Sequence, residues 1–363
     1  MIKQNTKDLK PGMVTATPVY SKSGQLLFPA HTALTSQQIS YLEFYAIPSV
    51  LILPEADVTK EMLDGTSPND MISYSQKVKK SREFHAFKVE YSKKTKIMKD
   101  SFNSLITSDK NYNPGILLSQ ISSLYENHLT SLSVFDMLHN MRQIDDTTYA
   151  HCINVAIISR MMGKWLDFSD EQLDALTLAG ILHDIGKCMI DQEILSKPSK
   201  LTDAEFEIIK KHTLMGVEII DPYHPDDRIR SAILLHHERC DGTGYPYGKT
   251  RDEISEFARI IAIADVYDAM TASRCYRKGF CPFEVIATFE REGYEKYDAK
   301  YLLPFLTHII NTYMSNSVLL NDGTTGKIIF INQEALSRPI IQTAGGEYIN
   351  LFKRQDLYIQ AVI

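Results

Sequence analysis

The sequence predicts a mainly α-helical protein, in which a helical domain is flanked by a small β-containing module at each end. The central part of the chain repeats apolar residues at helical spacing, for example over residues 148–156. Short apolar runs separated by turn residues precede and follow it. At 363 residues the chain is also long for a single domain. We therefore divide it into a β-containing N-terminal module (1–58), a linker and helical segment (59–125), a helical domain (126–315) and a β-rich C-terminal module (316–363).

The N-terminal module contains short apolar runs at residues 14–20 and 50–53, which are typical of strands. A turn is expected at 21–24, where the chain reads Ser-Lys-Ser-Gly, and a helix near 36–45. Such a module could sense a signal, dock a partner or cap the helical domain.

The next segment changes from a polar, turn-rich linker over 54–80 to a strongly charged helix over 81–106. Apolar residues follow a near-heptad spacing along this helix, at Phe84, Phe87, Tyr91, Met98 and Leu105. Lys94 and Ser101 interrupt that stripe, so we expect the helix to pack on its own domain, while a homodimer stays open. A further helix over 115–140 should lead into the helical domain.

After residue 315 the pattern returns to short β-type runs around a turn at 321–323. These runs are expected to form a small sheet or an open barrel, and they lie at 318–320, 326–331, 339–341 and 358–363.

Charge and cysteine usage limit the partners and the compartment. A net charge of −6 gives no general attraction for anions, so binding to a nucleic acid polymer is disfavoured. The five cysteines all lie in the central region without a C-x-x-C pair, which suits a reducing cytoplasm. The first residues contain no apolar signal core, and we find no long uncharged apolar run. We expect a soluble, cytoplasmic protein without a membrane span.

Histidine and aspartate residues form the most informative pattern in the chain. His183-Asp184 stands in Ile-Leu-His-Asp-Ile-Gly-Lys at 181–187, and His-His-Glu-Arg-Cys-Asp-Gly-Thr-Gly-Tyr-Pro follows at 236–246. Imidazoles mixed with carboxylates suit iron, manganese or zinc. Two such metals about 3.5–4 Å apart can clamp the attacking and leaving oxygens of a phosphate ester. The pattern therefore indicates a metal site that hydrolyses a phosphodiester.

Seven residues from five segments are candidate ligands, and each is weak by itself. A lone histidine on an amphipathic helix is usually structural, and Asp265 could instead be paired in a salt bridge. The segment 260–264 before Asp265 is apolar, however, so a buried carboxylate there needs compensation. The candidates are His151, His183, Asp184, His212, His236, His237 and Asp265.

In this order, the motifs over about 126–315 resemble the HD-GYP family, bacterial phosphodiesterases that degrade cyclic di-GMP. The resemblance implies an HD-type helical bundle, metal ligation by the seven candidates and a bridging role for Asp184. It also implies two divalent metals, preferably iron or manganese, although the ligand set would accept zinc. Family members with three metals carry an acidic residue where this chain has Thr147.

Residues that would bind the substrate also come from the resemblance. Lys187 would point into the site, and Arg274 and Arg277 would meet substrate phosphates, although either arginine could be a structural salt-bridge partner. In the Gly244-Tyr245-Pro246 loop, glycine allows close backbone approach and proline stiffens the chain. Tyr245 could stack on a guanine, dock a signalling partner protein, or simply pack within the turn.

The resemblance therefore implies that the protein opens the cyclic di-GMP ring to give linear pGpG. A second cut would convert pGpG to GMP. A different cyclic dinucleotide such as cyclic GMP-AMP is an alternative substrate, because residues that bind phosphates do not read the base. A noncatalytic cyclic dinucleotide sensor or scaffold is a further alternative, and its expected mark is loss of a ligand or of Lys187. This chain keeps all of them.

Overall fold

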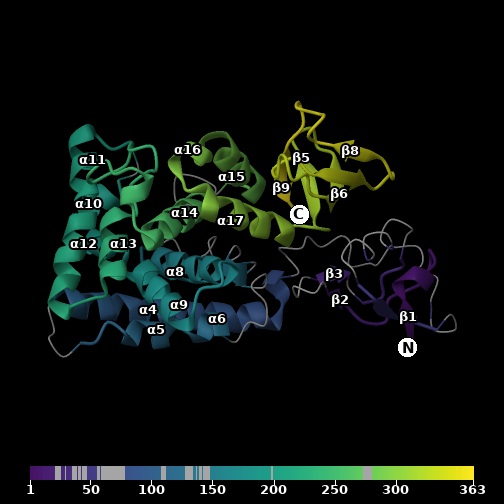
Figure 1. Ribbon diagram of the computed structural model, residues 1–363, viewed down its shortest axis with the longest axis horizontal. Coiled ribbons are helices and arrows are strands. Elements are labelled where there is room, and N and C mark those ends of the chain that lie inside the picture. Colours follow the sequence, from purple (N-terminus) through teal and green to yellow (C-terminus); the bar gives the residue numbers. More distant parts are fainter. Residues whose placement is uncertain are drawn as a thin grey trace. The chain divides into compact units, whose positions relative to one another are not determined.

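The computed structural model describes two compact units, Met1–Ser73 and Tyr74–Ile363, which we treat separately (Figure 1). The described residues are 1–20, 26–28, 30–34, 39, 42, 47–54, 58, 78–107, 112–126, 134, 135, 137, 138, 141, 148–197, 199–272 and 280–363. Among them, no helix is both long enough and apolar enough to cross a membrane.

The first unit contains two small antiparallel sheets. Strand β1 (Ile2–Asn5) pairs with β4 (Ser49–Ile52), and β2 (Val19–Tyr20) pairs with β3 (Leu26–Phe28). The 3-10 helix η1 (Thr6–Asp8) follows β1. The apolar core of this first unit consists of Leu9, Val19, Phe28, Leu34, Leu42, Ile47, Val50 and Ile52. Most of the expected helix at 36–45, the turn at 21–24 and most of the linker lie outside the described residues.

The second unit begins with the long helix α4 (Arg82–Ile106), which packs on its own domain as expected. Its N-cap Ser81 accepts a hydrogen bond from the Phe84 backbone, which fixes the start of the helix. The buried Tyr91 hydroxyl contacts the Ala150 carbonyl and the Asn154 amide oxygen, both in the neighbouring helix α8, at 2.9 and 2.7 Å.

The expectation of one helix over 115–140 is wrong in its first part. Two short helices, α5 (Ile116–Ile121) and α6 (Ser123–Glu126), stand there instead. The chain tightens at Ser122, whose carbonyl accepts from the Tyr125 amide three residues on and whose hydroxyl donates to the Ser119 carbonyl at 3.4 Å.

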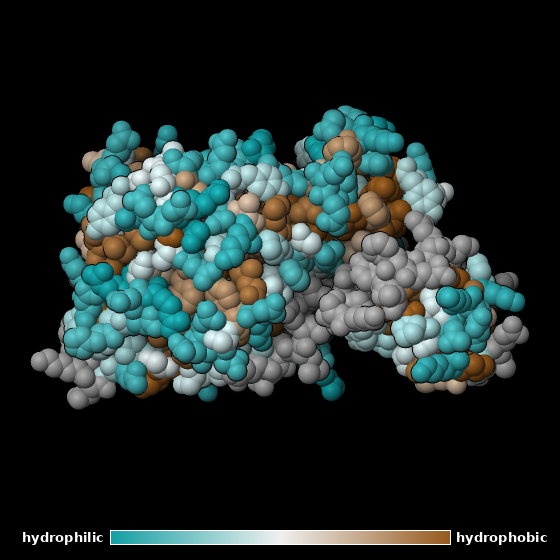
Figure 2. Space-filling model, viewed as in Figure 1, coloured by the Kyte–Doolittle hydropathy of each residue, from teal (hydrophilic) through white to brown (hydrophobic). Residues whose placement is uncertain are grey.

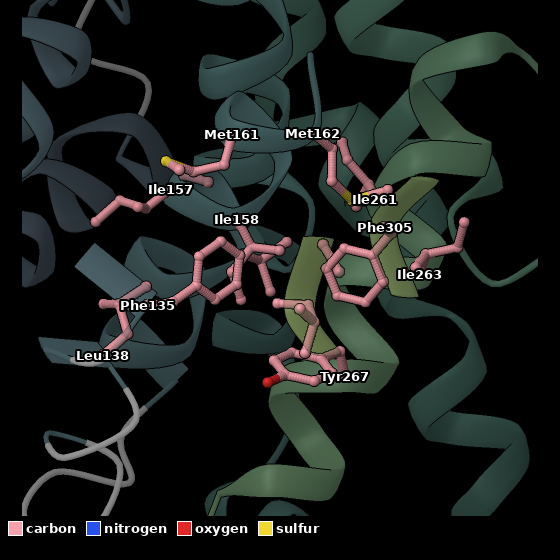
Figure 3. Packing of buried hydrophobic residues seen from close by; sticks show 14 of the residues in the cluster. Phe135, Leu138, Ile157, Ile158, Met161, Met162, Ile261, Ile263, Tyr267 and Phe305 are labelled. Atoms are coloured by element: carbon pink, nitrogen blue, oxygen red, sulfur yellow. The ribbon is translucent and has the colours of Figure 1, made fainter. Parts of the chain in front are cut away.

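Six longer helices build the bundle that carries the candidate site. Figure 3 shows part of its core, where Tyr267 and Phe305 meet edge to face with ring centroids 5.1 Å apart. The six are α8 (Thr148–Trp165), α9 (Asp170–Leu182), α12 (His212–Ile220), α13 (Asp227–Leu235), α14 (Glu256–Thr271) and α17 (Ala299–Thr312). Shorter pieces are η5 (Asp221–Tyr223), η6 (Arg251–Glu253), α15 (Pro282–Thr288), the π-helix η7 (Phe289–Gly293) and α16 (Tyr294–Lys296).

A glycine controls how closely the first two bundle helices approach. A Cβ atom on Gly180 of α9 would lie 2.7 Å from the Cα atom of Ala156 in α8, so only glycine fits. This close crossing brings the start of α8 beside the end of α9, and the rings of His151 and His183 are 5.3 Å apart.

Between α9 and α12 the chain forms η4 (Ile185–Met189), α10 (Gln192–Leu195) and α11 (Asp203–Lys210). We call residues 191–211 the α10–α11 arm. None of the described residues of this arm is buried. Thr202 and Glu205 cap α11 reciprocally, and the Glu205 carboxylate also accepts from Lys197 at 2.7 Å.

The chain ends in an antiparallel five-stranded sheet of order β8-β7-β6-β5-β9. Its strands are β5 (Ser317–Leu320), β6 (Thr325–Phe330), β7 (Ile340–Thr343), β8 (Tyr348–Asn350) and β9 (Ile359–Val362). The Glu290 carboxylate of η7 accepts from the backbone of Leu336 and Ser337, which ties the sheet to the bundle. Figure 2 shows that the visible face is mostly hydrophilic, with scattered apolar patches.

Candidate metal centre

The structure brings the seven candidate ligands together from five segments. His151 comes from α8, His183 and Asp184 from the end of α9, His212 from the start of α12, and Asp265 from α14. His236 and His237 follow α13 directly. They form two groups whose ligand atoms lie within 4.8 Å of one another: Asp184, His212, His236 and His237; and His151, His183 and Asp265.

The His-Asp pair does not lie within a helix. Helix α9 ends at Leu182, His183 is its C-cap, and Asp184 has φ −105° and ψ 9°. The following turn is the 3-10 helix η4, whose Gly186 touches α12. A Cβ atom there would lie 1.9 Å from the His212 carbonyl oxygen, so glycine is required for this contact.

Three of the histidines have a fixed tautomer. In His183, His212 and His236, Nδ1 lies 2.8, 2.6 and 2.9 Å from the carbonyl oxygen of the residue three positions earlier. A carbonyl can only accept, so Nδ1 carries the hydrogen and Nε2 of the neutral ring carries a lone pair. Burial lowers the pKa of His236 to about 4, which keeps this ring neutral at neutral pH.

The lone pairs face one another without a donor between them. His212 Nε2 and His236 Nε2 are 3.3 Å apart. Asp184 Oδ1 lies 3.3 Å from His212 Nε2 and 3.7 Å from His236 Nε2. His183 Nε2 and Asp184 Oδ1 are buried and have no hydrogen-bond partner. Buried acceptors in this arrangement are costly unless a cation satisfies them. The donor set therefore fits a divalent metal.

Beside the second group lies a carboxylate that the sequence reasoning missed. His151 Nε2 lies 3.0 Å from Asp265 Oδ1, while its Nδ1 lies 2.8 Å from Asp268 Oδ2. Burial disfavours the charged imidazole, but the hydrogen bonds to Asp265 and Asp268 raise the pKa of His151 to about 10 in the metal-free protein. A ligating histidine is commonly oriented by a carboxylate on its other nitrogen, which is the position of Asp268. Its spacing of three residues from Asp265 on one helix was the available signal.

Lys187 points at the shared carboxylate. Its Nζ donates to Asp184 Oδ2, the oxygen that also lies 3.7 Å from His151 Nε2. Burial opposes ionisation of Asp184, yet the Lys187 ammonium holds its pKa well below the usual range. Asp184 thus faces both ligand groups, with one oxygen toward each.

Comparison with known proteins agrees with this fold and with this set of candidate ligands. The sequence model of the HD domain fits residues 118–301, about half of the chain. The chain belongs to the HD domain family. The resemblance and the mainly α fold class predicted from the sequence are confirmed.

Curated relatives of this HD domain protein include a cyclic di-GMP phosphodiesterase of Pseudomonas aeruginosa, 32% identical over 228 residues, which are 62% of this chain and 54% of the relative. A 3′3′-cGAMP-specific phosphodiesterase of Vibrio cholerae is 37% identical over 143 residues, 39% of this chain and 31% of the relative. The chain thus spans about half, or less, of the length of these relatives. A solved HDG"Y"P protein from Bdellovibrio bacteriovorus aligns with 85% of this chain and 99% of its own, with a TM-score of 0.49 and 15% identity.

The Gly-Tyr-Pro loop of the HD domain folds back onto the ligands. A Cβ atom on Gly244 would lie 2.4 Å from the Glu238 Cα atom. The buried Glu238 carboxylate, also missed from the sequence, accepts from the backbone of Tyr247 at 2.7 Å and Lys249 at 2.9 Å. The Tyr245 ring, before Pro246 in a cis peptide, stacks on His237 with centroids 4.7 Å apart.

Three predicted positions fall outside the described part of the HD domain. Arg274 and Arg277 lie within residues 273–279, and Thr147 lies within 142–147. Contact of the two arginines with substrate phosphates stays a prediction, as do guanine stacking and partner docking by Tyr245.

Proposed function

We propose that this chain is a metal-dependent phosphodiesterase that hydrolyses cyclic di-GMP to pGpG and, by a second cut, to GMP. The observation that carries the proposal is the pair of facing Nε2 lone pairs of His212 and His236 beside the unpartnered Asp184 Oδ1. The names of the relatives support the substrate class.

We propose two divalent metal ions, iron or manganese, one at each ligand group. Bound ions of this kind supply Lewis acidity and activate water for attack on phosphorus. Asp184 would bridge them, because its two oxygens face different groups. Asp268 would hold the proton on His151 Nδ1 and so direct Nε2 into the site.

The cationic residues would bind and stabilise the phosphoryl group. The Lys187 ammonium donates a hydrogen bond to Asp184 Oδ2 and is within reach of a phosphate oxygen placed beside that carboxylate. Arg274 and Arg277 would contact the substrate phosphates, and Gly244, Tyr245 and Pro246 would line the loop beside it. The same proposal includes docking of signalling partners on this loop, a homodimer and a cytoplasmic location. It also includes domain limits at residues 58, 125 and 315.

A second candidate substrate is 3′3′-cGAMP, favoured by a relative specific for it that is 37% identical. Phosphate-binding cations do not distinguish guanine from adenine, so the ratio of kcat/KM for the two cyclic dinucleotides decides between them.

Anaerobic purification, metal analysis and product-resolved turnover test the proposal. We expect about two metals per chain and formation of pGpG or GMP, both lost in His183→Ala and Asp184→Ala. His85→Ala, a histidine on the exposed face of α4, is the matched control and should change neither. Binding of cyclic di-GMP without turnover in the metal-loaded protein would establish the sensor alternative instead.

A further inference from the structure

The α10–α11 arm carries a large aromatic side chain that is exposed. Phe206 of α11 is 45% exposed, although phenylalanine is usually among the buried residues. No side chain of α11 is buried, so the helix contributes no anchor to the core. Single exposed apolar residues are common on proteins, and the location of this one is what matters.

A series of ring contacts links Phe206 to the metal centre. The Phe206 ring meets Tyr245 edge to face, with centroids 6.2 Å apart and an interplanar angle of 82°. Tyr245 in turn stacks on the candidate ligand His237 at 4.7 Å. Lys210 Nζ lies over the Phe206 ring, 5.5 Å from its centroid, and is paired with Glu207. Phe206 therefore stands at the rim of the site, two ring contacts away from a ligand.

We propose that Phe206 is the platform on which one base of the cyclic dinucleotide stacks while the scissile phosphate is at the metal centre. This inference rests on the proposed function. The ribose separates each base from its phosphate, so a base cannot reach the ligands and must lie at the rim. An exposed aromatic ring there offers a flat apolar surface, and purines have large π-faces that stack on such rings.

The chemistry of stacking sets what Phe206 can and cannot do. Stacking tolerates any base, so Phe206 would position cyclic di-GMP and 3′3′-cGAMP equally without discriminating between them. It does not touch the reacting atoms, so it is a positioning residue. Its loss should raise KM and leave kcat nearly unchanged.

Steady-state kinetics of the full metal-loaded chain test this role. For Phe206→Ala we expect KM for both cyclic dinucleotides to rise by the same factor, about 5-fold to 150-fold, with kcat within about twofold. Phe206→Trp should restore KM, because the larger ring stacks at least as well. The metal content of the purified protein, measured by elemental analysis, should be unaffected by Phe206→Ala.

Phe352→Ala is the matched control, since Phe352 is 41% exposed on the C-terminal module. An unchanged KM in Phe206→Ala, or loss of metal from this variant, overturns the inference while the proposed function stands. If the wild-type chain binds cyclic di-GMP without turnover, the same variants are compared by Kd, and an unchanged Kd overturns the inference. If it neither binds nor hydrolyses either dinucleotide, both proposals are wrong.

Discussion

The Glu238 carboxylate should hold the Gly-Tyr-Pro loop, and its replacement by glutamine tests this directly. Glu238 is 2% exposed, and its two oxygens accept from the Tyr247 and Lys249 amides. Glutamine has the same shape but keeps one oxygen, and its NH₂ group would face a backbone N–H. One charge-assisted hydrogen bond, worth about 1.5–3 kcal/mol, is lost and the second is weakened. Relief of the buried charge offsets part of this.

We therefore expect Glu238→Gln to lower the unfolding free energy of the second unit by about 2–3 kcal/mol. Urea denaturation of the metal-free protein measures this, with fluorescence of Trp165, the only tryptophan of the chain, as the signal. Trp165 stacks on His308 at 4.2 Å and on Phe135 at 5.7 Å, so it reports on the bundle.

Glu295→Gln is the control, because Glu295 is exposed and should change stability by less than about 0.5 kcal/mol. A Glu238→Gln midpoint equal to that of the wild type would refute the reasoning, since the loop would then be held by contacts other than this carboxylate.

Three further predictions concern the metal centre. Gly186→Ala places a methyl group against the His212 carbonyl, so we expect loss of metal from the purified protein, measured by elemental analysis. Asp268→Asn replaces the charged acceptor that orients His151 with a neutral amide, and the metal affinity should fall about 10–100-fold in a chelator competition. His236 has a pKa of about 4 in the metal-free fold, below its unfolded value of about 6.5. The unfolded chain therefore binds this proton first, and the unfolding free energy should fall as the pH drops from about 6.5 toward 4, less steeply in His236→Ala.

Each of these has a control or a contrary outcome. Gly345→Ala should keep its metal, because a Cβ atom there meets only Thr343 Oγ1 at 3.8 Å. Wild-type metal affinity in Asp268→Asn would mean that His151 is oriented by its other contacts. An identical acid slope in wild type and His236→Ala would contradict the burial of a neutral ring at this position.

The sequence predicted the helical core, most of the strands and the seven candidate ligands because these depend on local patterns and ordered motifs. It did not predict strands β1, β3 and β8, which have only three or four residues and are too short to show a clear alternation. Asp268, Glu238 and Phe206 were missed because their roles depend on contacts that the fold creates. Asp268 contacts the His151 ring on another helix, and Glu238 accepts from the backbone of a loop that folds back toward it. Phe206 lies on an exposed arm and contacts Tyr245 beside the site.

Three ligand histidines stand where a helix ends. His183 and His236 cap α9 and α13, and His212, the first residue of α12, follows the C-cap residue of α11. The last carbonyls of a helix have no partner within it, and each of these rings donates Nδ1–H to one of them. The same side chain therefore completes a helix with one nitrogen and presents a lone pair with the other. A descendant of this protein that abandoned metal binding by losing one of these histidines would also fray a helix, whereas losing Asp265, in the middle of α14, would spare the helix ends.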